Sequence, residues 1–71
     1  MPKLKTISGK NLVRDLQNRG WTIARQSGSH VTLKMEGRRV TVPVHSNQDL
    51  PIGTFRSILT EAGIDADEYR Q

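Results

Sequence analysis

Apolar residues recur at helical spacing near both ends of the chain and alternate with polar residues in the middle. Near the start, Leu12 and Leu16 lie four positions apart, which places them on one face of a helix. Ser8 is a residue type that favours the N-cap, and Gly20 favours a helix end. We therefore predict a first helix over about residues 9–19.

Three runs with the alternation of β-strands follow this helix: WTIARQ, HVTLKM and RVTVPV, at residues 21–26, 30–35 and 39–44. In the second run, Val31, Leu33 and Met35 alternate with polar residues, which predicts one buried and one solvated face. The connections SGS and EGR each contain glycine and are short enough for hairpins. Because Pro43 cannot donate to a strand ladder, we place the third run at an edge and the second in the middle.

A second helix is predicted after Pro51, a residue that suits the start of a helix. Its expected buried stripe consists of Ile52, Phe55, Ile58, Leu59 and Ala62. Gly63 suits its end. Beyond Ile64, DADEY predicts a short extra turn over about 65–70, with Asp65 as N-cap and Glu68 completing a loose capping box.

These elements predict a single α+β domain over residues 1–71. In the expected α-β-β-β-α order, both helices pack on one face of a three-stranded antiparallel sheet. The absence of cysteine excludes disulfides and a thiolate zinc site. No segment approaches the roughly 20 apolar residues of a membrane-spanning helix. We therefore expect a cytoplasmic protein that does not bind a membrane.

The charge is unevenly distributed along the chain. Residues 1–48 carry nine of the eleven Lys and Arg but two of the seven acidic residues, which gives this part a charge of +7. Residues 49–71 carry −3. A concentrated positive field favours an anionic partner such as nucleic acid, although a basic surface can also serve solubility alone.

His30 lies at the start of the second strand, on the face opposite Val31, so it is not predicted to be a core residue. Gly28 allows a turn in which backbone N–H groups can approach a phosphate, and Ser29 adds a hydroxyl group. A histidine beside such a turn can act as a general acid or base on a phosphodiester. The alternative is an exposed histidine without a role beyond solvation.

The second histidine, His45, follows the third strand and could assist at this site, contact RNA or cap the polar loop. Two histidines fifteen positions apart without nearby carboxylates do not form a typical metal-ligand set, so we expect no metal and no other cofactor. Basic residues predicted to contact phosphates on the solvated face and its second hairpin are Arg25, Lys34, Arg38 and Arg39, with Lys10 from the first helix.

The segments GW…R…GSH, VTVPVH and DLPIGTFRSILTEAGI, taken together in this order, resemble the HicA (YcfA-like) mRNA interferase toxins of HicAB toxin–antitoxin systems. The resemblance covers about residues 8–64. It implies a fold like that of double-stranded-RNA-binding domains. It also implies a ribosome-independent endoribonuclease that cleaves mRNA and is neutralised by a HicB-type antitoxin covering its active site. Since we expect no metal site, we expect this cleavage to be metal-independent.

The family's catalytic histidine falls on His30, which would act as the single general acid or base. In the mechanism we expect, Gly28 and Ser29 hold the phosphate, while Arg25, Lys34 and Arg39 offset charge in the transition state. The free protein is expected to be a monomer. Two alternatives remain open: a non-catalytic RNA-binding module of the same fold, and a protein-interaction domain that uses its sheet face.

Overall fold

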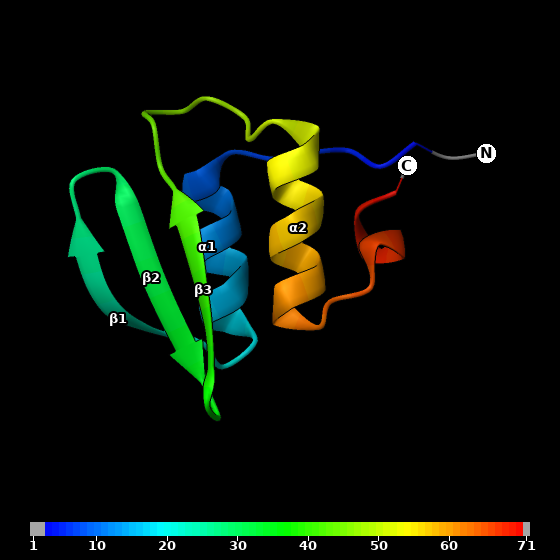
Figure 1. Cartoon of the computed structure of the whole chain (residues 1–71). Helices are drawn as coiled ribbons and strands as arrows, with labels where there is room; N and C mark the ends of the chain where they lie inside the picture. The colour runs from blue at the N-terminus through cyan, green and yellow to red at the C-terminus, as the bar shows by residue number, and fades with distance from the viewer. Residues whose placement is uncertain (1–2, 71) are drawn as a thin grey trace.

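The computed structural model describes residues 3–70 and confirms the predicted α+β fold (Figure 1). The elements are α1 (Gly9–Asn18), β1 (Thr22–Ser27), β2 (His30–Met35), β3 (Arg38–Pro43), α2 (Ile52–Ala62) and the 3₁₀ turn η1 (Ala66–Tyr69). The strands form one antiparallel sheet in the order β1-β2-β3, so β2 is central and Pro43 lies on an edge strand, as predicted. Both helices cover the same side of this sheet (Figure 1).

The ends of the two helices follow the local sequence. The Ser8 side chain accepts a hydrogen bond from the Asn11 N–H at 3.1 Å, which confirms it as the N-cap of α1. Gly63 ends α2 with φ +73°, in the left-handed region that glycine enters without steric cost.

The core lies between the sheet and the helices. Its largest fully buried side chains are Phe55, Leu12, Leu16, Leu33, Leu59, Val40 and Val42. Four of the five residues of the predicted α2 stripe are buried, but the prediction for Ile52 is wrong, because its side chain is 46% exposed. Ile52 is the first residue of α2, and helical side chains lean toward the N-terminus, so it points past the first turn into solvent.

The packing of α1 against the end of β3 requires glycine at position 9. Gly9 is buried, and a Cβ atom placed on it would overlap the carbonyl oxygen of Pro43. Just beyond this contact, the Val44 N–H donates to the Ser29 carbonyl at 2.6 Å. The N-terminus of α1 therefore lies directly against the point where the chain leaves the sheet.

The loop that follows β3 is also attached to the segment before α1. The Leu50 N–H donates to the Ile7 carbonyl at 2.8 Å, and Asp49 forms a backbone bridge with Ser8. The Thr6 hydroxyl donates to the Leu50 carbonyl at 2.8 Å. These bonds fix the course of the loop as it approaches α2.

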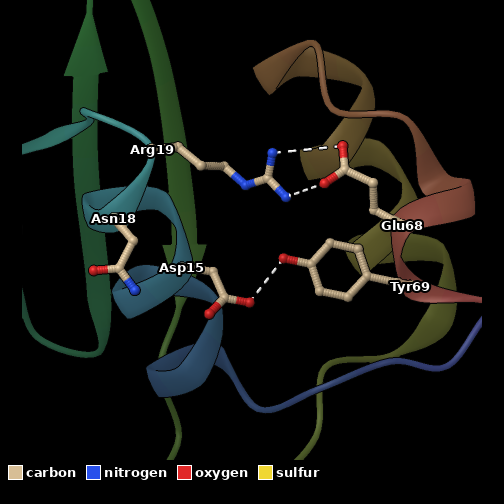
Figure 2. A pocket seen from close by; sticks show the side chains of 5 residues that line it. All are labelled: Asp15, Asn18, Arg19, Glu68 and Tyr69. Atoms are coloured by element: carbon tan, nitrogen blue, oxygen red, sulfur yellow. Dashed lines mark hydrogen bonds and ion pairs between the residues drawn. The ribbon is translucent and has the colours of Figure 1, made fainter.

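The C-terminal turn η1 is held on α1 by two polar contacts, shown in Figure 2. Arg19 forms an ion pair with Glu68, and the Tyr69 hydroxyl donates to the Asp15 carboxylate at 2.8 Å. The ring of Tyr69 also meets Phe55 edge to face, with centroids 5.0 Å apart. The four residues of the two polar contacts line an open cavity of about 400 Å³. Its charged side chains are therefore mostly paired within the cavity itself.

The predicted N-cap of this turn is confirmed, since the Asp65 carboxylate accepts from the Asp67 N–H at 2.9 Å. The predicted second half of the capping box is wrong. The Glu68 side chain pairs with Arg19 instead of returning to Asp65, because an ion pair with a guanidinium is a stronger interaction than a bond to a neutral N–H.

Replacing Gly9 with Ala tests the close contact with β3. Alanine favours helix by up to about 1 kcal/mol over glycine, but overpacking against backbone costs about 1–3 kcal/mol, so we expect a net loss of stability. The control is Gly53→Ala, because a Cβ on Gly53 meets no atom within 4 Å in the first turn of α2. Urea unfolding should show Gly9→Ala destabilised and Gly53→Ala unchanged or slightly stabilised; equal stability of both variants would contradict the contact.

A second prediction concerns Tyr69, whose pKa is raised from 10.0 to about 12 by burial and by its hydrogen bond to Asp15. Since the folded state favours the protonated phenol, the raised pKa of Tyr69 contributes to the free energy of unfolding. This stabilisation is fully present below pH 10 and is lost as the pH rises toward 12. The full shift corresponds to about 2.7 kcal/mol, and solvent screening of this half-buried group reduces our expectation to about 1 kcal/mol.

The measurement is the free energy of unfolding between pH 8 and pH 12 for the parent and Tyr69→Phe. We expect the stability difference between the two proteins to shrink above pH 10. A difference that stays constant across this range would show that the Tyr69 hydroxyl does not titrate as the structure implies.

Candidate functional site

The two histidines lie side by side at one end of the sheet. Their ring centroids are 6.4 Å apart and the rings are nearly perpendicular, at 82°. His30 begins β2 and His45 lies two residues beyond the end of β3, and both side chains are exposed. A group bound at this end of the sheet can therefore contact both imidazole rings from solvent.

Strand register explains this proximity. His30 is paired with Ser27 on one side and with Pro43 on the other. One residue beyond this last pair, the Val44 N–H donates to the Ser29 carbonyl, so the chain that follows β3 stays next to the β1–β2 turn. The loop therefore leaves β3 beside the β1–β2 turn, which brings His45 next to His30.

The turn before His30 consists of Gly28 and Ser29. Gly28 has φ +58° and no atom lies within 4 Å of where its Cβ would be, so the space above the turn is open. The Ser29 side chain is half-buried, and its hydroxyl makes no hydrogen bond to another residue of 3–70. This turn can therefore present a hydroxyl and backbone groups to a ligand beside His30.

Three cations share the outer face of the sheet with His30. Arg25 is paired with Thr32, and Lys34 is paired with Arg39. The bulge between Ile23 and Arg25 shifts the parity of β1 and brings Arg25 to this outer face. At about 3.3 Å per residue, Lys34 lies about 13 Å along β2 from His30. Lys34 and Arg39 are therefore placed to contact phosphates at a distance from His30, and not a phosphate bound beside His30 itself.

Two predicted phosphate contacts lie elsewhere. Arg38 lies at the second hairpin, as predicted, but it pairs with Met35, which packs against the core, so it is on the helix side of the sheet and not on the outer face. Its guanidinium lies beside Gly63 at the end of α2, on the helix side. Lys10 also lies on the helix side, where it borders an open groove with Val13 and Ile23.

Within residues 3–70, no cluster of three or more His, Asp or Glu side chains has the arrangement of a metal site. The same residues include no helix long and apolar enough to cross a membrane.

Sequence reasoning missed a cavity that His45 also lines. It lies between the end of β3, the loop before α2 and the first turn of α2, and its volume is about 250 Å³. The sequence predicts only a polar connection here, and the acid Asp49 within it is the one residue type that could have indicated a site.

Comparison with known proteins gives one family match. A family model described as the HicA toxin of bacterial toxin–antitoxin systems matches residues 9–64. This range begins at the first residue of α1 and ends just after α2, so it includes both histidines and leaves out η1. No curated protein matches the chain.

Proposed function

The chain belongs to the HicA toxin family of bacterial toxin–antitoxin systems, and we propose that it is an endoribonuclease in which His30 and His45 transfer the protons of RNA cleavage. The observation that carries this proposal is the exposed pair of imidazole rings 6.4 Å apart. RNA provides its own nucleophile, the ribose 2′-hydroxyl, so cleavage needs an acid and a base and requires no metal.

In the proposed reaction, the 2′-oxygen attacks the adjacent phosphorus while the bond from phosphorus to the 5′-oxygen breaks. One imidazole takes the proton from the 2′-hydroxyl, and the other, in its protonated form, gives a proton to the departing 5′-oxygen. The products are a 2′,3′-cyclic phosphate and a 5′-hydroxyl. Attacking and leaving oxygens lie on opposite sides of phosphorus, which is why two separate histidines suit this step better than one.

The remaining groups position the RNA. The turn at Gly28 and Ser29 borders His30 and would hold the reacting phosphate through backbone N–H groups and the hydroxyl. Arg25 lies opposite Thr32, nearer to the histidines than Lys34 and Arg39, and all three would neutralise phosphates along one strand of RNA.

Membership of a toxin–antitoxin family also implies an antitoxin partner. We propose a HicB-type protein that covers the two histidines. Because both rings are exposed at one end of the sheet, a partner seated there would block access of RNA to them directly.

The role of the histidine pair can be tested with His30→Ala and His45→Ala on an unstructured RNA in the presence of EDTA. A positioned general acid or base contributes about 10²–10⁴-fold, so each variant should lose at least about 100-fold in cleavage rate while RNA affinity changes little. Cleavage by His30→Ala at the parental rate would contradict the proposal and indicate a contaminating nuclease. RNA binding without cleavage by the parent would indicate a non-catalytic binding module.

The path of the RNA can be tested with two neighbouring arginines that lie on opposite faces of the sheet. Arg39→Gln removes a cation from the outer face and should lower the slope of log affinity against log salt by about one. Arg38→Gln removes the same charge from the helix side and should leave the slope unchanged. Equal effects of the two variants on the slope would show that RNA does not follow the outer face.

A further inference from the structure

The cavity next to His45 is lined by both apolar and polar residues. Pro43, Leu50 and Pro51 are its apolar lining residues. Cavities that bind drug-sized ligands have volumes of about 300–1,000 Å³, and this one measures about 250 Å³. Its size and its apolar lining suit a single aromatic ring system better than a whole nucleotide.

Besides His45, the polar lining residues are Gln48, Asp49 and Thr54. The side chains of these three residues make no hydrogen bond or ion pair with any other side chain or backbone group of residues 3–70. The backbone beneath them is fixed, since Asp49 bridges to Ser8 and Leu50 bonds to Ile7. The cavity therefore presents unused hydrogen-bonding groups from a defined position.

A carboxylate at this place identifies the kind of ligand. Asp49 would repel a phosphate, so the cavity is not an extension of the phosphate-binding face. A carboxylate accepts hydrogen bonds through two oxygens and pairs best with two adjacent donors on one planar edge. Among the RNA bases only guanine has such an edge, formed by its N1–H and its N2 amino group.

We propose that this cavity binds a guanine base of the RNA substrate, adjacent to the phosphate that reacts between His30 and His45, and that Asp49 selects guanine by accepting from N1–H and the N2 amino group. The proposal rests on the proposed ribonuclease function, because it places the base relative to the reacting phosphate. His45 is one ring of the histidine pair and also lines the cavity, so the two parts of the site are adjacent.

The experiment uses two sets of short RNAs. In one set only the nucleotide before the cleaved bond varies, and in the other only the nucleotide after it. In each set the varied nucleotide is guanosine, adenosine, cytidine or uridine. The parent should cleave the guanosine RNA faster than the adenosine RNA. Asp49→Asn should reduce this preference by about 5- to 150-fold, because an amide offers one acceptor and one donor to an edge with two donors. The control Glu61→Gln removes the same charge near the far end of α2 and should keep the preference.

A second measurement separates failure of this inference from failure of the proposed function. Equilibrium binding of the same RNAs to His30→Ala and to His30→Ala combined with Asp49→Asn needs no cleavage. Preferential binding of guanosine RNA that disappears with the Asp49 substitution supports the cavity assignment even if the parent cuts nothing. Cleavage and binding without any guanine preference, or a preference unchanged by Asp49→Asn, would overturn it.

Discussion

The arrangement of the candidate site depends on the close contact between the N-terminus of α1 and the end of β3. Only a residue without a side chain fits at Gly9, which faces the Pro43 carbonyl. Together with the bond from Val44 to Ser29, this contact determines where the chain leaves the sheet. His45 owes its position next to His30 to that course, so a packing constraint on the helix side determines the geometry of groups on the solvent side.

This arrangement allows a small domain to use both faces of one sheet. A chain of 71 residues can bury only a modest core, and here one face of β2 supplies Val31 and Leu33 to it. The opposite face is left for His30, Lys34 and the cations beside them. Because side chains alternate along β2, the residues that stabilise the fold lie on one face and those proposed to act on RNA lie on the other. Because these outer-face side chains are exposed, we expect substitutions there to cost little stability.

Much of the fold could be predicted from local patterns, because helix caps, hairpin turns and strand alternation act over a few residues. Positions that depend on more distant contacts could not. Alternation along β3 already separates Arg38, on the side of the buried Val40, from Arg39 on the opposite face. The position of the Arg38 guanidinium beside Gly63 depends on how α2 packs on the sheet, which no local pattern shows. The pairing of His30 with Pro43 follows once Glu36 and Gly37 are known to form that turn.

The central claim is that two histidines catalyse attack by the ribose 2′-hydroxyl, and the nature of the cleaved ends tests it most directly. The substrate would be a short RNA with 2′-deoxyribose at the cleaved position, compared with the all-ribose RNA and followed by mass spectrometry. The expected result is a 2′,3′-cyclic phosphate and a 5′-hydroxyl from the ribose substrate and no cleavage at the deoxy position. Cleavage of the deoxy substrate, or products with a 5′-phosphate, would contradict this mechanism.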